Sequence, residues 1–279
     1  MNGQKGPAKA LSYEPIDPGA LSTALGSSLF SVSILHHESI DSTNALAKEL
    51  ALKGAPEGTL VLAEEQTAGR GRRGRTWVSP AGGNLLFSIL LRPFLEPGRV
   101  FVLTMILALE TAEALRRASG LPVRIKWPND LYLGGKKLAG ILTECSVQDA
   151  TLEHVILGMG VNLNWHPPME EGISHPATSL LAETGKRFSR KALLVEILKG
   201  LECSYGKVLQ GEIDPFYTRW NELSLILGRA VTIESESEIL EGRAVRIDET
   251  GALILETPDG STRRILCGDV SLRIDALPR

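Results

Sequence analysis

The chain has 279 residues, of which 43 % are hydrophobic and 23 % are charged, and its net charge is −3 at neutral pH. This composition excludes an intrinsically disordered chain and suits one large domain with a small one, or two medium domains. The slightly negative charge excludes a chain-wide basic field of the kind that attracts nucleic acid, so any anion must be bound at a local site.

The cysteines and the start of the chain indicate a cytoplasmic protein. The three cysteines are far apart, without CxxC spacing or a cluster of histidines, so neither a disulfide framework nor a zinc site is expected for Cys145, Cys203 and Cys267. No basic-then-apolar signal segment begins the chain. The longest apolar stretch, residues 100–109, is about half of what a bilayer span needs, so residues 97–118 are predicted to form a buried amphipathic helix.

The first part of the chain predicts an extension and then a mixed domain. Residues 1–30 carry a short predicted helix around residues 16–25, and they are too few for a free-standing winged helix-turn-helix domain of about 60 residues. A helix over residues 45–52 is predicted to begin at the Asp-Ser-Thr-Asn of residues 41–44. Strands are predicted over residues 59–63, 85–91, 123–127, 131–133, 136–145 and 152–161, and later helices over 189–209 and 215–223.

The texture of the sequence changes at residue 228. Short β-prone runs over residues 230–233, 239–247, 252–256 and 262–266 alternate with glycine-containing turns, which predicts a small β-barrel. We therefore expect three parts: an N-terminal extension (1–30), a mixed domain that carries the chemistry (31–227) and a small C-terminal β domain (228–279).

Residues 69–75 form an unusual loop, with four arginines and three glycines directly after a predicted strand. Glycines let the backbone approach a ligand, and arginines are permanently charged, forked donors for phosphate or carboxylate. Composition alone leaves three interpretations open: a loop that folds over an anion, a nucleic-acid segment, or a solvated basic loop. The overall acidity and the apolar strands on both sides disfavour the nucleic-acid segment.

Two more segments carry residues of a ligand-site type. Residues 126–130 (Lys-Trp-Pro-Asn-Asp) bring a lysine, an amide and a carboxylate together, and Lys137 follows a predicted Gly134-Gly135 hairpin turn that returns a second lysine towards them. A plain strand-to-turn junction and a surface lysine are the alternatives. Residues 158–162 (Gly-Met-Gly-Val-Asn) end a strand with small residues, against which a flat ligand would fit.

Taken together and in this order, these segments resemble the biotin protein ligase family. The resemblance covers about residues 31–275 and rests on residues 41–44, 65–77, 126–132, 136–144 and 158–162, with residues 268–273 similar to the family's C-terminal end. The arginine-glycine loop and the 126–130 block together are highly specific for this family, whereas either one alone would not be. The resemblance implies an α+β fold: a mixed sheet with helices, related to class II tRNA synthetases, plus a C-terminal SH3-like β-barrel.

The resemblance also implies a two-step ligase. The carboxylate of biotin attacks the α-phosphate of ATP and gives biotinyl-adenylate and pyrophosphate. A lysine of a biotin carboxyl carrier protein then attacks the mixed anhydride and releases AMP. Mg²⁺ is expected because it neutralises the phosphates, although the sequence shows no all-protein metal cage. The family also suggests a homodimer formed through a sheet edge.

Site residues follow from the matching positions. The predicted biotin site comprises Ser42, Thr43, Gln66, Gly69, Arg70, Arg72, Lys137, Gly140, Gly158 and Gly160. The predicted nucleotide site comprises Arg70, Arg72, Arg75, Trp77, Lys126, Asn129, Asn162 and Arg190. Lys137 and Arg72 are the predicted catalytic residues, because their charges would stabilise the charge that develops in the transition state. Asp130 is expected to orient a lysine or to touch magnesium through water.

Three competing functions are weighed against this one. A lipoate or octanoate ligase on the same fold usually carries an Arg-Arg-x-Ser/Gly-Gly-Gly type of loop, which the sequence lacks. A bifunctional ligase and repressor would carry an N-terminal helix-turn-helix, and residues 1–30 show no clear recognition helix. A binding protein with decayed catalytic residues is disfavoured by the complete motif set. We therefore expect a ligase without repressor activity that binds neither nucleic acid nor membrane.

Overall fold

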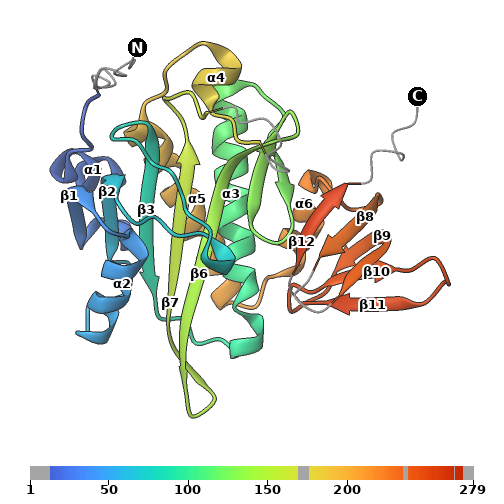
Figure 1. Cartoon of the computed structure of the whole chain (residues 1–279). Helices are drawn as coiled ribbons and strands as arrows, with labels where there is room; N and C mark the ends of the chain where they lie inside the picture. Colours follow the sequence, from blue (N-terminus) through green and yellow to red (C-terminus); the bar gives the residue numbers. More distant parts are fainter. Residues whose placement is uncertain (1–12, 169–175, 235–237, 267, 273–279) are drawn as a thin grey trace.

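A computed structural model describes residues 13–168, 176–234, 238–266 and 268–272 of the chain (Figure 1). The first twelve residues of the predicted extension, Cys267 and residues 273–279 lie outside the described residues. The chain folds into a mixed α+β structure with two sheets. The larger sheet has seven strands in the order β1-β2-β3-β7-β6-β5-β4, and the smaller has five in the order β11-β10-β9-β8-β12.

The seven-stranded sheet confirms the strands predicted between residues 59 and 161. It contains β1 (Ile34–Ile40), β2 (Leu60–Gln66), β3 (Asn84–Leu91), β4 (Arg124–Lys126), β5 (Asp130–Leu133), β6 (Lys136–Gln148) and β7 (Thr151–Asn162). β1 and β2 pair in parallel, and the other neighbours pair antiparallel. The predicted Gly134-Gly135 turn joins β5 to β6, and both glycines have the positive φ of a tight hairpin turn, 57° and 78°.

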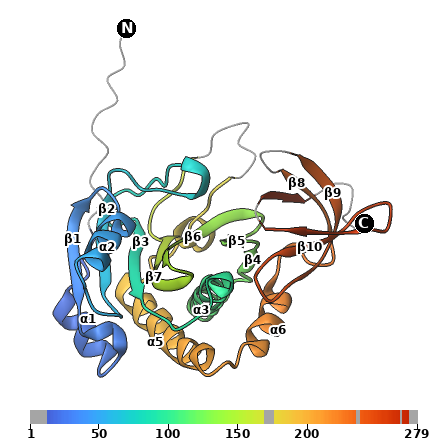
Figure 2. The ribbon, with the colours of Figure 1, turned by 90° about the horizontal axis from the view of Figure 1, so that it is seen from below.

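Helices cover both faces of this sheet. Successive side chains of a strand point to opposite faces, and here both sets are apolar and must be buried. Leu60 and Leu62 of β2 point into the main core, whereas Val61 between them points into a second cluster. The main core is formed with α1 (Pro18–Leu25), α3 (Phe101–Ser119) and α5 (Arg190–Leu209), and Figure 2 shows α3 and α5 along one face of the sheet. The second cluster packs beneath α2 (Thr43–Leu52) on the opposite face.

The N-terminal segment belongs to this core. The predicted short helix is α1, and Ile16, Leu21, Leu25 and the following Phe30 are buried with the residues of α3 and α5. α3 confirms the predicted buried helix but begins at Phe101, because residues 97–99 form a separate 3-10 turn. Among the helices of the described residues, none combines the length and hydropathy that a bilayer span requires.

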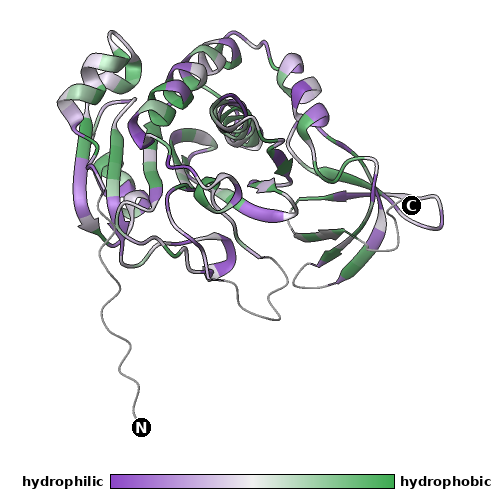
Figure 3. Ribbon diagram, turned by 90° about the horizontal axis from the view of Figure 1, so that it is seen from above, coloured by the Kyte–Doolittle hydropathy of each residue, from purple (hydrophilic) through white to green (hydrophobic). Residues whose placement is uncertain are grey.

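The C-terminal sheet is antiparallel and lies against the end of the larger one. It contains β8 (Ala230–Glu234), β9 (Ile239–Ile247), β10 (Leu253–Glu256), β11 (Thr262–Ile265) and β12 (Asp269–Leu272). Two more helices, α4 (Leu180–Thr184) and α6 (Asp214–Leu223), precede it. Trp127 Nε1 donates to the Gly251 carbonyl at 2.8 Å, so the two sheets are joined beside the 126–130 block. Figure 3 shows that many residues of the strands are hydrophobic, whereas hydrophilic residues alternate with hydrophobic ones along the helices.

Candidate functional site

A pocket of about 530 Å³ opens on the face of the large sheet that carries α2. Its volume is in the range of small-molecule sites. All but two of the residues predicted for the site line it: Ser42, Thr43, Gln66, Arg70, Arg72, Arg75, Trp77, Lys126, Asn129, Asp130, Lys137, Gly140, Gly158, Gly160 and Asn162. Segments that are far apart in the sequence therefore meet in one cavity, as the motif pattern predicted.

The glycines of β7 are explained by the protein's own side chains. A Cβ added at Gly158 would lie 1.8 Å from Asn44 Oδ1, and one added at Gly160 would lie 2.6 Å from the Trp77 ring. We expected these positions to be small so that a flat ligand could press on the backbone. The structure instead presses the Asn44 amide and the Trp77 indole against the strand, and the pocket opens beside them.

The start of α2 forms the neutral polar end of the pocket. Ser42 is the N-cap residue of the helix, and its hydroxyl accepts from the Ala45 N–H at 3.4 Å. The Thr43 N–H donates to Gln66 Oε1 at 2.8 Å, and Thr43 Oγ1 lies 3.1 Å from the same oxygen. These two contacts hold the carbonyl end of the Gln66 amide against α2.

The arginine-glycine loop is a short hairpin that projects beside the pocket. The Gly71 N–H donates to the Arg75 carbonyl at 2.7 Å, and the Trp77 N–H donates to the Gly69 carbonyl at 2.9 Å. Gly69 is buried below the hairpin and does not line the pocket, so its predicted contact with biotin is not supported by its position. A Cβ at Gly69 would lie 2.6 Å from the Trp77 carbonyl oxygen, which accounts for the glycine.

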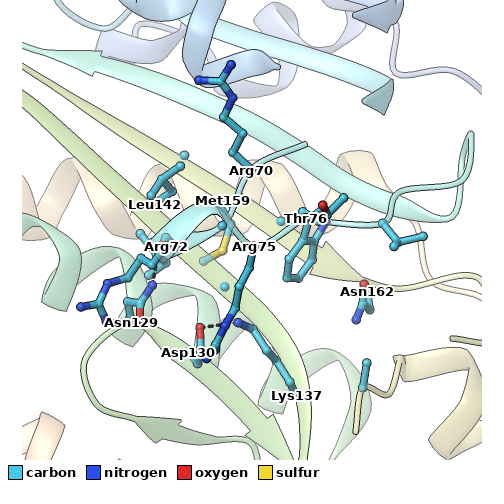
Figure 4. Close-up of a pocket in the computed structure, with 18 of the residues that line it drawn as sticks. Arg70, Arg72, Arg75, Thr76, Asn129, Asp130, Lys137, Leu142, Met159 and Asn162 are labelled. Carbon is cyan, nitrogen blue, oxygen red and sulfur yellow. Dashed lines mark hydrogen bonds and ion pairs between the residues drawn. The ribbon is translucent and has the colours of Figure 1, made fainter. Parts of the chain in front are cut away.

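The arginines of this hairpin point in different directions. Arg72 Nη1 donates to Asn129 Oδ1 at 3.2 Å, which joins the hairpin to the 126–130 block. Figure 4 shows the Arg75 side chain extending towards Asp130 and Lys137, whereas Arg70 points away from them. Arg72 and Arg75 are therefore the arginines aimed at the cationic end of the pocket.

Lys137 and Asp130 face each other across the β5–β6 hairpin. Lys137 Nζ lies 2.8 Å from Asp130 Oδ1 and 5.7 Å from the centre of the Trp77 ring (Figure 4). The predicted return of a second lysine to the 126–130 block is confirmed, since Lys126 lines the same pocket and donates to the Tyr132 hydroxyl at 3.2 Å. A lysine held by a carboxylate and an aromatic face is pre-oriented towards a bound anion.

The acidic side chains near the pocket are few. Among the described residues, no group of three or more His, Cys, Asp or Glu side chains is arranged to hold a metal ion. Of the described residues that line the pocket, Asp130 is the one with a carboxylate. Any divalent cation here would therefore depend mainly on ligand phosphates for its coordination.

Arg190 lies away from the pocket, so its position does not support the predicted contact with the nucleotide. Its side chain is 5 % exposed and forms an ion pair with Glu64, which is 1 % exposed. Arg190 Nη2 also donates to the Glu14 carbonyl at 2.7 Å, and the guanidinium lies 5.2 Å from the centre of the Tyr13 ring. This arginine fastens the N-terminal segment to the sheet.

The Glu64 carboxylate is the centre of that cluster. Besides Arg190, it accepts hydrogen bonds from His36 Nε2 at 2.7 Å and from the Ile16 N–H at 3.0 Å. Burial by itself would raise the pKa of Glu64, but these three partners outweigh it and hold the pKa below its ordinary value. The stabilisation is therefore present at neutral pH and is lost as the pH falls through this lowered pKa.

Replacing Arg190 with methionine should lower the free energy of unfolding by about 3–5 kcal/mol, because it leaves a buried carboxylate without its ion-pair partner. Urea denaturation measures this loss, and Lys191→Met, at the exposed neighbouring position, is the control. The KM for ATP of the folded variant should stay unchanged. Unchanged stability together with a raised KM for ATP would instead support the predicted contact of Arg190 with the nucleotide.

Other lining residues were missed by the sequence analysis. They come from the start of α2, strand β5, the chain after β7 and the C-terminal sheet, and they include Asn44, Tyr132, Trp165, Pro167, Ala177, Gly268 and Val270. Gly268 and Val270 lie in the 268–273 block that carries part of the family resemblance, so that block was the signal for them. Ala177 reaches the pocket because its segment pairs with β6, where the Thr178 N–H donates to the Lys137 carbonyl at 2.8 Å.

Comparison with known proteins gives relatives that cover most of the chain. Residues 37–162 match the biotin/lipoate A/B protein ligase family, and residues 226–273 match the biotin protein ligase C-terminal domain. The bifunctional ligase/repressor BirA of Bacillus subtilis is 34% identical over 91% of this chain and 80% of its own length. A biotin–[acetyl-CoA-carboxylase] ligase of Paracoccus denitrificans is 38% identical over 79% of this chain and 92% of its own length.

A solved structure is similar over most of the chain as well. The biotin protein ligase from Aquifex aeolicus in complex with biotin and ATP superimposes with a TM-score of 0.70 and 32% identity, over 87% of this chain and 99% of that chain. Both the sequence identity and the mixed α+β architecture extend over most of the chain. The chain therefore belongs to the biotin protein ligase family.

Proposed function

We propose that this chain joins biotin to a specific lysine of a biotin carboxyl carrier protein, using ATP and forming biotinyl-5′-AMP. The observation that carries the proposal is one continuous pocket with two chemically different ends. Thr43 and Gln66 form a neutral, hydrogen-bonding end, while Arg72, Arg75 and Lys137 form a cationic end. A ligand that is polar but neutral at one end and anionic at the other matches both, and the Aquifex aeolicus relative was solved with biotin and ATP.

At the neutral end, the ureido ring of biotin would meet Ser42, Thr43 and Gln66. A buried polar ring must find matching partners, since each unpaired group costs about 1–3 kcal/mol. Three of the glycines that line the pocket, Gly140, Gly158 and Gly160, lie on the strands β6 and β7 beside this end.

At the cationic end, the carboxylate of biotin and the α-phosphate of ATP must approach each other against their repulsion. The biotin carboxylate oxygen attacks the α-phosphorus, and the bond from that phosphorus to the bridging oxygen of pyrophosphate breaks. Lys137 donates to both reacting anions, and Arg72 covers them from the hairpin, so that positive charge faces the charge that develops. Arg75, Trp77, Lys126, Asn129 and Asn162 complete the nucleotide side in this proposal. Arg70, which points away from Lys137 in the structure, would have to turn towards the ligand to join them.

In the second half-reaction, the carrier lysine attacks the acyl carbon of biotinyl-adenylate. An amide bond forms, the bond to the AMP oxygen breaks, and AMP leaves with its negative charge. The same cationic groups stabilise the departing phosphate. The proton lost by the attacking amine passes to solvent.

Mg²⁺ accompanies ATP in this proposal. Asp130, the one carboxylate among the described residues that line the pocket, fits an ion carried chiefly by the phosphates, because Mg²⁺ usually binds through one or two carboxylates plus substrate oxygens. The ion would neutralise phosphate charge when bound. Asp130 is already paired with Lys137, so its first role here is to orient that lysine.

We propose residues 31–227 as the catalytic domain and 228–279 as the C-terminal domain. We further assign the large sheet to the fold of class II tRNA synthetases and the five-stranded sheet to the SH3-like barrels. The antiparallel strand order and the family match over residues 226–273 support the second assignment. A cytoplasmic location suits the use of ATP. The homodimer suggested by the family remains a prediction, which light scattering would test.

The test is transfer of biotin to a purified carrier domain in the presence of ATP, detected by mass spectrometry. We expect one lysine of the carrier to gain biotin and no transfer when lipoate replaces biotin. Transfer of lipoate alone would favour the lipoate ligase. Some relatives are named ligase/repressors, so a gel-shift assay on operator DNA tests the alternative of repressor activity.

Replacing Arg72 with glycine should let biotinyl-adenylate leave the enzyme, because the variant loses the guanidinium that bridges the hairpin to Asn129. We expect the dissociation rate of the adenylate to rise about 100-fold, which is the scale for losing one charged hydrogen-bonding partner. The released adenylate should label lysines of an unrelated protein such as albumin. Arg73→Gly, on the exposed turn of the same hairpin, is the control. Unchanged retention by the Arg72 variant would contradict the role.

A further inference from the structure

The turn that carries Trp127 lies at the edge of the large sheet. It joins β4 to β5, and β4 is the last strand in the order of that sheet. An edge strand leaves one row of its backbone groups unpaired by the sheet. Here the support on the open side comes from later in the chain. The Leu225 N–H donates to the Ile125 carbonyl at 2.7 Å, and Trp127 Nε1 donates to the Gly251 carbonyl at 2.8 Å.

The contact between Trp127 and Gly251 is buried. The Trp127 residue is 1 % exposed, and its indole N–H can only donate. A buried donor that loses its acceptor costs about 1–3 kcal/mol, so the indole follows the Gly251 carbonyl. Lys126 precedes Trp127 and Asn129 follows two residues after it, and both line the pocket. The position of the Gly251 carbonyl therefore bears on the nucleotide side of the pocket.

Gly251 is closely packed between the two sheets. Its φ is 86°, in the left-handed region that favours glycine. A Cβ there would lie 2.0 Å from Phe101 Cγ, at the start of α3. The Phe101 ring packs edge-on against Trp220 of α6, with the ring centres 5.6 Å apart. The carbonyl of Gly251 reaches Trp127 from this site only while the turn around it keeps its shape.

The Asp248 carboxylate sets the shape of that turn. Asp248 Oδ1 accepts from the N–H groups of Thr250 and Ala252, both at 2.9 Å, and from the Thr250 hydroxyl at 2.7 Å. Asp248 Oδ2 accepts from Arg264 Nε of β11 at 2.6 Å. Burial would raise the pKa of Asp248, but these hydrogen bonds outweigh it and lower the pKa to about 2. The carboxylate is therefore ionised at neutral pH.

One of these bonds orients the Gly251 carbonyl directly. The Gly251 carbonyl and the Ala252 N–H belong to the same peptide unit, which is planar and trans, so they point in opposite directions. The Ala252 N–H is bound to Asp248 on one side. The carbonyl therefore faces the Trp127 indole on the other side.

We infer that Asp248 is a positioning residue for the reaction: by orienting the Gly251 peptide it holds the Trp127 indole and, with it, the nucleotide side of the pocket. Asp248 is not among the described residues that line the pocket, so it acts through Trp127. The inference rests on the proposed function and gives the C-terminal sheet a part in it. The start of α2 and the end of β2, which form the neutral end, should not depend on Asp248.

The test measures two ligands separately on the full-length Asp248→Ala variant. Without the carboxylate, the Gly251 peptide is no longer fixed and the turn at Trp127 loses its support. We expect the KM for ATP in biotin-dependent pyrophosphate exchange to rise about tenfold, the scale of one hydrogen bond. The Kd of biotin, measured by calorimetry, should stay within about twofold. Asp248→Asn keeps an acceptor oxygen for the Ala252 N–H, so its KM should return to within about threefold of wild type.

Trp127→Phe tests whether the effect passes through the indole. This variant removes the N–H and keeps an aromatic ring, so its KM for ATP should also rise about tenfold. Because both substitutions break the same contact, adding Asp248→Ala to Trp127→Phe should change the KM by less than about twofold. Trp127→Phe also keeps the inference testable if Asp248→Ala does not fold.

Asp259 provides a matched control within the same sheet. It accepts from the Ser261 N–H at 3.0 Å and from the Thr257 hydroxyl at 2.6 Å, and hydrogen bonds from these two residues lower its pKa to about 2. Its turn joins β10 to β11, which Figure 1 shows on the side of the C-terminal sheet away from the large sheet. Asp259→Ala should therefore leave the KM for ATP within about twofold of wild type.

Three results would each overturn the inference: equal KM values in the Asp248 and Asp259 variants, equal weakening of biotin and ATP, or effects of Asp248→Ala and Trp127→Phe that multiply. A wild-type protein without biotin-dependent exchange would overturn the proposed function instead. The Kd of ATP from calorimetry would then still compare the variants, so the two failures are distinguishable.

Discussion

Replacing Lys137 with alanine is expected to slow the formation of biotinyl-adenylate by about 10²–10³-fold, the usual cost of losing one group that stabilises the transition state. Lys137 Nζ is held 2.8 Å from Asp130 and against the Trp77 ring, so its charge is already in place when the ligands arrive. Biotin-dependent exchange of pyrophosphate into ATP measures this step without a carrier protein. The rate constant should fall far more than the affinity for biotin, since the urea end of the pocket is unchanged.

The neighbouring lysine provides a matched control. Lys136 Nζ lies 2.9 Å from Glu183 Oε1, and Lys136 does not belong to the pocket lining. Lys136→Ala removes the same charge from the protein one residue away, and its exchange rate should stay within about twofold, as expected for a partly exposed ion pair outside the pocket. If the Lys137 variant kept adenylation within threefold of wild type, the catalytic role of this lysine would be wrong.

Replacing Gly158 with alanine should lower the affinity for biotin by about 100-fold, or close to 3 kcal/mol. The added Cβ would lie 1.8 Å from Asn44 Oδ1, and Asn44 is anchored by Leu142 and Glu144. The start of α2 must then move, which displaces Thr43 from the pocket wall. Overpacking of this kind also lowers the free energy of unfolding by about 1–3 kcal/mol, which calorimetry and urea denaturation would measure.

Gly206→Ala is the control for that substitution. Gly206 lies within α5, and a Cβ there meets no heavy atom within 4 Å. An alanine in a helix is favoured over glycine by up to about 1 kcal/mol, so this variant should be at least as stable as wild type and bind biotin normally. Normal biotin binding by the Gly158 variant would show that Asn44 and α2 can yield without harm.

The strands and helices could be predicted largely because their signals are local. β3 is buried along its whole length and was visible as an apolar run that only Ser88 interrupts, and the Gly134-Gly135 turn was visible from two residues with no side chain. β1 was not predicted, since its half-exposed sequence has neither a clean alternation nor an apolar run. Its strand conformation depends on the parallel pairing with β2, which its own residues do not indicate.

The sequence predicted most of the residues that line the pocket, but not the contacts that each of them makes. Motif order alone identified Lys137 and Asp130, yet their ion pair depends on the register of the β5–β6 hairpin. Arg190 shows the limit of this reasoning. An arginine at the start of a helix looks the same in sequence whether it meets a nucleotide or a buried glutamate such as Glu64, which lies far away along the chain.

What the sequence determined by itself is the family pattern, the elements with strong periodicity and the residue types that gather at the pocket. Only the tertiary structure decided what each of those residues touches. The glycines of β7 make room for Asn44 and Trp77, and the hydrogen bonds around Ser88 join residues of three separate strands and one helix. The physical reason is that hydrogen bonds and close packing act over a few ångströms, between segments whose distance in space is unrelated to their separation along the chain.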